Sequence, residues 1–124
     1  MTLAYWCVLI AGVLPLAATI CAKWGFRRFD NNNPRDWLAK QTGMRARANA
    51  AQQNSFEAFA FFAAAVIIAH LAHAPQGRID ALAAAFVALR VAYLGCYLAD
   101  LAMPRTVVWG LAYACIIGLF IIAA

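Results

Sequence analysis

The chain has 124 residues, of which 66% are hydrophobic and only 12% are charged. A soluble domain of this size carries roughly twice that share of charged residues, so the surplus of apolar side chains predicts surface in contact with lipid. The net charge of +5 does not indicate nucleic-acid binding, because most of the cations gather in one connection instead of spreading over a solvated face.

Four apolar stretches are long enough to cross a bilayer as helices, which takes about 20 residues each. The chain begins without the positive charge of a cleavable leader, so we expect its first stretch to be a retained membrane helix. Two short connections predict antiparallel neighbours. We therefore expect one all-α integral membrane domain over residues 1–124, a four-helix transmembrane bundle with helices at about 3–22, 49–74, 79–101 and 104–124.

The long connection at 23–48 is polar and cationic. Because cytoplasmic loops of membrane proteins are enriched in Lys and Arg, this loop is expected to be cytoplasmic and both termini to lie on the other side. Asp36-Trp37-Leu38 is expected to begin a short surface helix. The Ala-rich composition favours a bacterial source, and hence an inner membrane. Seven of the chain's ten cations lie in this connection: Lys23, Arg27, Arg28, Arg35, Lys40, Arg45 and Arg47.

Cysteine and histidine show no metal-binding pattern. The cysteines lie in apolar runs without CxxC spacing, which predicts buried inert thiols. His70 and His73 close the second apolar run with no Cys or carboxylate at ligand spacing, so we interpret them as interfacial residues and expect no metal site. The four cysteines are Cys7, Cys21, Cys96 and Cys115.

Glu57 is an acid near the start of the apolar run from Phe56 to Ala74. A carboxylate inside a membrane segment is costly unless it has a partner, a water-filled cavity or a function. Arg47 and Asn54 are seven residues apart, and Asn54 and Glu57 three apart, so on a helix the three share one broad face. A cation, an amide and an acid on one face predict a polar ligand site at the membrane boundary.

The third apolar stretch carries a second polar stripe, with Arg90, Tyr93, Tyr97 and Asp100 at helical spacing. Arg90 is near the middle of the span and is expected to face the bundle interior. It either neutralises Glu57 or another buried acid, or contributes to a ligand site; the two roles are compatible. The tyrosines are open to a packing role as well as a binding role.

Arg105 follows Pro104 at the start of the fourth stretch, where its charge would add to the positive end of a helix. The predicted topology places it on the same side of the membrane as Arg47 and Glu57. This placement predicts a cationic pocket at the cytoplasmic boundary. The alternative is that Arg105 anchors the end of its helix among lipid head groups.

Three motifs together resemble the MAPEG family, the membrane-associated proteins of eicosanoid and glutathione metabolism. The resemblance covers nearly the whole chain and extends to Asn33-Pro34-x-Asp36 in the long loop. The family includes microsomal glutathione transferases, leukotriene C synthase, microsomal prostaglandin E synthase and the non-enzymatic lipoxygenase-activating protein. The motifs are Arg47-x6-Asn54-x2-Glu57, Arg90-x2-Tyr93-x3-Tyr97-Leu98 and Pro104-Arg105-Thr106.

The resemblance implies a homotrimer that binds glutathione between protomers and takes a small apolar co-substrate from the membrane lipids. Glu57 would bind the ammonium of glutathione and Arg47 a carboxylate. Arg105 would be the catalytic residue, because a nearby cation lowers the pKa of a thiol from about 8.5 and favours the nucleophilic thiolate. The expected glutathione-binding residues are Arg47, Asn54, Glu57, Arg90, Tyr93, Tyr97 and Thr106.

This chain departs from the family's pattern at three positions. Gln53 stands where prostaglandin-synthase-like members have Arg, and Tyr93 stands where they have His. In the fourth helix Trp109 stands where a tyrosine is frequent. The sequence therefore supports two functions: a glutathione-dependent transferase or peroxidase acting on apolar electrophiles, or a non-catalytic membrane protein that binds lipid. A transporter or channel subunit is less favoured, because the polar residues crowd one end of the predicted bundle.

Overall fold

A computed structural model describes residues 1–23 and 29–124, so Arg27 and Arg28 of the cationic connection lie outside the described residues. Four long helices run antiparallel: α1 (Leu3–Ala22), α3 (Gly43–Leu71), α4 (Gln76–Leu98) and α5 (Ala102–Ala123). All four are long and apolar enough to cross a membrane. This arrangement agrees with the predicted all-helical membrane bundle.

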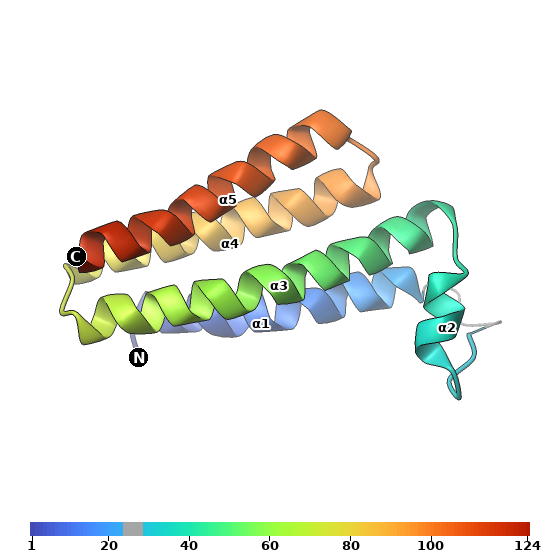
Figure 1. The fold of residues 1–124 in the computed structure, drawn as a ribbon, viewed down its shortest axis with the longest axis horizontal. Helices are drawn as coiled ribbons and strands as arrows, with labels where there is room; N and C mark the ends of the chain where they lie inside the picture. The colour runs from blue at the N-terminus through green and yellow to red at the C-terminus, as the bar shows by residue number, and fades with distance from the viewer. Residues whose placement is uncertain (24–28) are drawn as a thin grey trace.

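The bundle has two unlike ends (Figure 1). Both termini and the α3–α4 turn lie at one end, and the connections from α1 to α3 and from α4 to α5 lie at the other. The helices pack most extensively as two pairs, α1 with α3 and α4 with α5. The pairs diverge toward the end that carries the short helix α2 (Pro34–Ala39).

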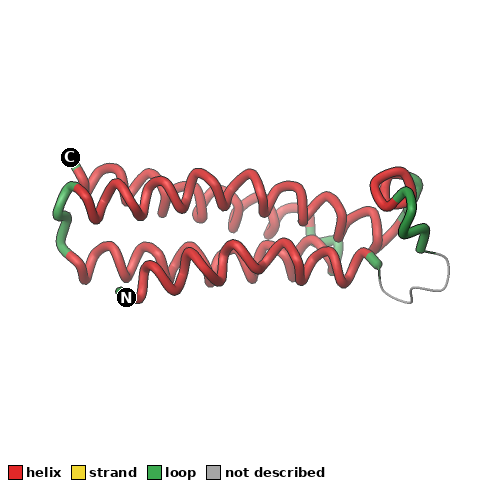
Figure 2. The backbone as a smooth tube through the Cα atoms, turned by 90° about the horizontal axis from the view of Figure 1, so that it is seen from below, coloured by secondary structure: helices red, strands yellow, loops and turns green. Residues whose placement is uncertain are grey.

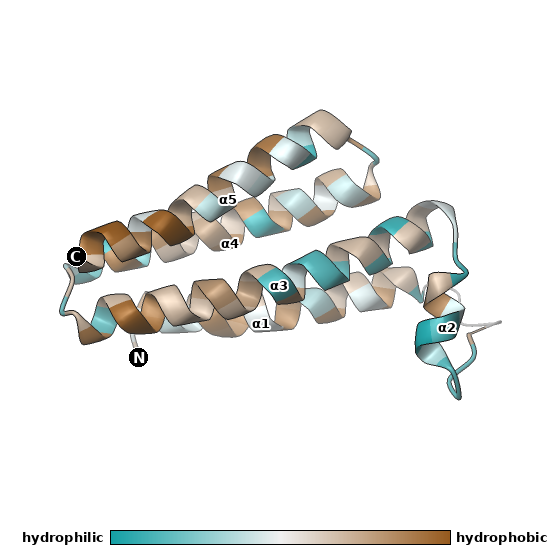
Figure 3. Cartoon of the chain, viewed as in Figure 1, coloured by the Kyte–Doolittle hydropathy of each residue, from teal (hydrophilic) through white to brown (hydrophobic). Residues whose placement is uncertain are grey.

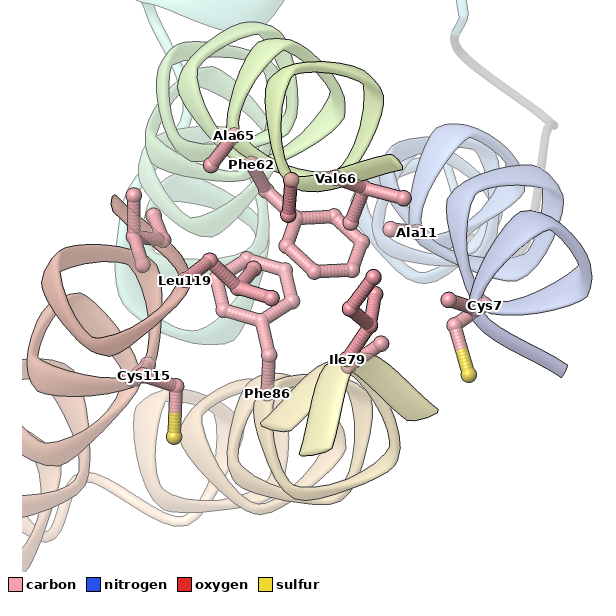
Figure 4. Packing of buried hydrophobic residues seen from close by; sticks show 14 of the residues in the cluster. Cys7, Ala11, Phe62, Ala65, Val66, Ile79, Phe86, Cys115 and Leu119 are labelled. Carbon is pink, nitrogen blue, oxygen red and sulfur yellow. The ribbon is translucent and has the colours of Figure 1, made fainter. Parts of the chain in front are cut away.

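The apolar core is formed by residues of all four long helices (Figure 4). Phe62 of α3 stacks on Phe86 of α4 with ring centroids 3.9 Å apart, and Ile79 and Leu119 pack beside them. On α3 the buried positions recur every three or four residues, which is the spacing of one helical face. Arg90 lies about one turn after Phe86 on α4, toward the end of the bundle that carries α2.

Polar residues gather at the α2 end, along α2 and the first half of α3 (Figure 3). The polar first two turns of α3 explain why it begins at Gly43 and not at about Asn49, as hydropathy had indicated. An apolar run marks the part of a helix in hydrocarbon and leaves its solvated extension undetected.

Helix α4 ends at Leu98, three residues before the predicted limit. Asp100 has φ of +59°. The Leu101 N–H then donates to the Cys96 carbonyl over 2.9 Å, the pattern of a helix closed by a left-handed residue. Asp100 therefore lies outside α4 and does not continue the stripe of Tyr93 and Tyr97.

Helix α2 lies across the end of the bundle, as the view in Figure 2 also shows. It begins with Pro34 in its first turn, within the loop where a short surface helix was expected. The edge of Trp37 meets Phe29 at a centroid distance of 5.1 Å, and the Arg45 guanidinium lies 5.6 Å from the Trp37 ring. These contacts hold α2 beside the first turns of α3.

A tight turn precedes α2. The Asn32 N–H donates to the Asp30 carboxylate over 2.9 Å, and the Asn33 amide donates to its second oxygen over 3.3 Å. These hydrogen bonds favour the charged carboxylate and lower the pKa of Asp30 below its usual value. The turn thus directs the chain into Pro34.

Candidate functional site

Arg90 is the centre of the polar half of the bundle. Its side chain is 2% exposed, and its Nη2 donates to the Asn54 side-chain oxygen over 2.9 Å and to the Ser55 hydroxyl over 3.3 Å. Within the described residues Arg90 makes no ion pair with Glu57 or another acid. The interpretation that Arg90 neutralises Glu57 is therefore unsupported within one protomer, where neutral oxygens solvate the guanidinium instead.

Two tyrosines connect Arg90 with Arg105. The Arg90 guanidinium lies 4.1 Å from the centre of the Tyr93 ring, which meets the Tyr97 ring edge-on at 5.6 Å. The Arg105 guanidinium lies 4.4 Å from the centre of the Tyr97 ring. Because the face of an aromatic ring is electron-rich, each tyrosine attracts the cation above it. The result is a row in which two adjacent rings lie between two cations, from the buried Arg90 to the half-buried Arg105.

Arg105 is oriented by this row. It projects from the first turn of α5, and its contact with Tyr97 ties that turn to α4. The side chain remains partly open to the surface. A fixed, accessible guanidinium at a helix N-terminus is suited to stabilise an anion that approaches from outside the protomer.

Arg47 has a structural contact that the sequence did not indicate. Its Nη2 donates to the Leu98 carbonyl over 3.3 Å, and its Nη1 lies 4.0 Å from the Asp100 carboxylate. Both partners belong to the end of α4. A cation at a helix C-terminus satisfies a free carbonyl and interacts favourably with the helix dipole. In one protomer Arg47 thus joins α3 to the end of α4.

Glu57 and Thr106 do not join the row of arginines and tyrosines. The Glu57 side chain is exposed on α3, on the same face as Gln53, and the described residues give it no hydrogen-bond or ion-pair partner. The Thr106 hydroxyl is exposed and donates to the Ala102 carbonyl of its own helix over 3.1 Å. Of the predicted site residues, one protomer brings together Asn54, Arg90, Tyr93, Tyr97 and Arg105.

A small cavity beside Arg90 is lined also by Ser55, Phe59 and Phe86 and has a volume of about 10 Å³. A cavity of this size has room for about one water molecule, so it is not a substrate pocket. The Nη1 of Arg90 is buried without a hydrogen-bond partner among the described residues. A single water molecule in this cavity would accept a hydrogen bond from Arg90 Nη1.

A larger groove lies between α2 and α3, with a volume of about 350 Å³. Asn49, Gln52, Gln53 and Phe56 line it from α3 at spacings of three, one and three, which place them on one helical face. Arg35 and Leu38 line it from α2. The stripe leads along α3 toward Glu57, one turn beyond Gln53.

Sequence reasoning missed Ser55, Arg35 and the partnership of Arg47 with Asp100. Ser55 lies four residues after the buried Ala51 and three before the buried Ala58, so its place on the apolar face could have identified it. Arg35 and Asp100 belong to connections, and their neighbours depend on how the chain turns there.

A comparison with protein-family models matches the MAPEG family model to residues 3–124, essentially the whole chain. Neither the comparison with curated proteins nor that with solved structures found a match.

Proposed function

Because the chain belongs to the MAPEG family and is an integral membrane protein of the eicosanoid and glutathione metabolism type, we propose that it is a glutathione-dependent transferase or peroxidase acting on apolar electrophiles at the lipid interface. The observation that carries this proposal is Arg105, a partly exposed guanidinium held over Tyr97 at the start of α5.

Arg105 would stabilise the thiolate of glutathione. A thiol with a pKa near 8.5 is mostly protonated at neutral pH, and a cation beside the sulfur favours loss of its proton to solvent. In conjugation, the thiolate sulfur forms a bond to the electrophilic carbon, and the leaving group departs with the bonding electrons. In peroxide reduction, the thiolate sulfur attacks one peroxide oxygen, the O–O bond breaks, and the other oxygen leaves and takes a proton to give an alcohol. The sulfenic acid so formed is attacked by the sulfur of a second glutathione, which gives the disulfide and releases water.

The active assembly would be a homotrimer with glutathione between protomers. Glu57 and Gln53 support this, because both are exposed on a helix that crosses the membrane, and polar side chains in contact with lipid are costly. A neighbouring protomer would cover them. In the same assembly, a neighbouring protomer would close the side of the site that is open to the surface in a single protomer.

The cationic α2 end would face the cytoplasm, in an inner membrane of bacterial type. The cations at this end support the orientation, since Lys and Arg are retained on the cytoplasmic side. They include Lys23, Arg35, Lys40, Arg45 and Arg47. Glutathione would then enter from the cytoplasm, and the apolar co-substrate from the bilayer.

The test compares the wild type with Arg105→Leu in conjugation of glutathione to an aryl halide. We expect the variant to lose most activity, while native mass spectrometry shows trimers of both proteins and their thermal midpoints agree. The matched control is Arg78→Leu, which removes an exposed arginine at the opposite end of the bundle and should leave activity unchanged. Equal activity of wild type and Arg105→Leu would make Arg105 an interfacial anchor, and monomers in mild detergent would contradict the trimer.

One observation favours a non-catalytic lipid-binding protein instead. Arg47 and Arg90, two cations expected to hold glutathione, make contacts within the protomer. If the wild type converts none of a panel of electrophiles and peroxides and does not bind glutathione calorimetrically, this second function replaces the first.

A further inference from the structure

The groove between α2 and α3 has the composition of a site for an anionic ligand with an apolar edge. Arg35 contributes a cation, and Asn49, Gln52 and Gln53 contribute three amide groups, each with two N–H donors. Phe56 and Leu38 contribute the apolar part. Its volume of about 350 Å³ lies within the range of small-molecule sites.

Arg35 is available to a ligand. Its side chain is exposed, and no acid among the described residues forms an ion pair with it. Arg45, in the first turn of α3, lies against the Trp37 ring. Helix α2 thus presents Arg35 to the groove, while the contact of Trp37 with Arg45 holds α2 against the first turn of α3.

An acid lies on α3 one turn beyond the groove. Gln53 and Glu57 are four residues apart on α3, about 6 Å along the helix axis, and both are exposed on the same face. A ligand with a carboxylate at one end and an ammonium at the other would meet Arg35 and the amides at the first and Glu57 at the second. Charge-assisted hydrogen bonds of this kind are about twice as strong as neutral ones.

We propose that Arg35, with Asn49, Gln52 and Gln53, forms a carboxylate-binding subsite that α2 supplies to the peptide-like thiol. The inference rests on the proposed function, since it names the part of the site that holds one end of glutathione. It assigns Arg35 a binding role and leaves the thiolate to Arg105.

The test measures glutathione affinity by calorimetry for protein in phosphatidylcholine nanodiscs. We expect Arg35→Gln to weaken binding about tenfold or more, the loss typical of one charge-assisted hydrogen-bonding partner, whereas the control Arg78→Gln leaves the affinity unchanged. The double variant Arg35→Gln with Gln53→Arg should recover most of the affinity, because position 53 lines the same groove and can return the cation to it.

Two monoamides of glutathione, each lacking one carboxylate, identify the interacting group. The monoamide that lacks the bound carboxylate should bind the wild type weakly and bind Arg35→Gln equally weakly, so that the effect of the substitution disappears for that ligand alone. If the substitution weakens binding of both monoamides as much as that of glutathione, Arg35 acts at a distance and the subsite is overturned.

The remaining outcomes separate this subsite from the function on which it rests. If the wild type binds glutathione and Arg35→Gln binds it equally well, the subsite is wrong and the proposed function stands. If the wild type does not bind glutathione, the proposed function fails and the subsite with it. If Arg35→Gln leaves glutathione binding unchanged but loses the thermal stabilisation that phosphatidylglycerol gives the wild type, the groove holds an anionic lipid head group, and the carboxylate subsite is overturned.

Discussion

Asn54→Leu should destabilise this protein more than removal of the buried charge itself. Asn54 accepts the shorter of the two hydrogen bonds that Arg90 Nη2 donates, at 2.9 Å against 3.3 Å for the Ser55 hydroxyl. Leucine would leave a guanidinium that is 2% exposed with only the longer bond, while Nη1 has no partner among the described residues. The Asn54 variant therefore strands a buried charge.

The magnitude follows from the hydrogen bonds. A hydrogen bond to a charged group contributes about 1.5–3 kcal/mol, and stranding a buried charge costs about 3–5 kcal/mol. Because Ser55 and the Tyr93 ring remain as partners, we expect Asn54→Leu to lower the free energy of unfolding by about 3 kcal/mol. Arg90→Met removes the charge together with its desolvation, and should cost only about 1–2 kcal/mol for the oxygens left without a donor.

The double variant Asn54→Leu with Arg90→Met is the decisive measurement. It should be about as stable as Arg90→Met alone, which gives a coupling of about 3 kcal/mol between the two sites, the full cost of Asn54→Leu. The assay is reversible unfolding by SDS in mixed micelles without glutathione, and Asn49→Leu, an amide that does not contact Arg90, is the control. Additive costs, or an Arg90→Met variant less stable than Asn54→Leu, would refute the view that neutral oxygens solvate this charge.

Two further predictions concern the ligand and the membrane. Glu57→Gln should cost little stability without glutathione, because Glu57 is exposed and the described residues give it no ion pair. It should, however, abolish the stabilisation of about 2.7 kcal/mol that glutathione at 100 times its Kd gives the wild type. A variant still fully stabilised by glutathione would remove Glu57 from the site, and a variant unstable without glutathione would make the residue structural. Reporter fusions after Asn32 and after Gln76 should report opposite sides of the membrane, the first cytoplasmic, because the cations lie beside the first position; the reverse result would contradict both the orientation and entry of glutathione from the cytoplasm.

The sequence by itself was sufficient for the four membrane helices and the family. Apolar runs of about 20 residues predict spans because a helix satisfies its own backbone in lipid and apolar side chains favour transfer into it, which depends on composition more than on neighbours. Helix limits were less accurate where polar residues carry a helix beyond the hydrocarbon, as at Gly43, or where a left-handed residue ends it, as at Asp100.

Only the tertiary structure decided which polar side chains meet. Helical periodicity shows that Tyr93 and Tyr97 share a face of α4, but the rotation and spacing of packed helices determine that Ser55 faces Arg90 and that Arg105 lies over Tyr97. The groove at Arg35 likewise depends on how the first connection lays α2 beside α3. These arrangements arise from many weak packing contacts between segments distant in the chain, and no spacing within one segment contains them.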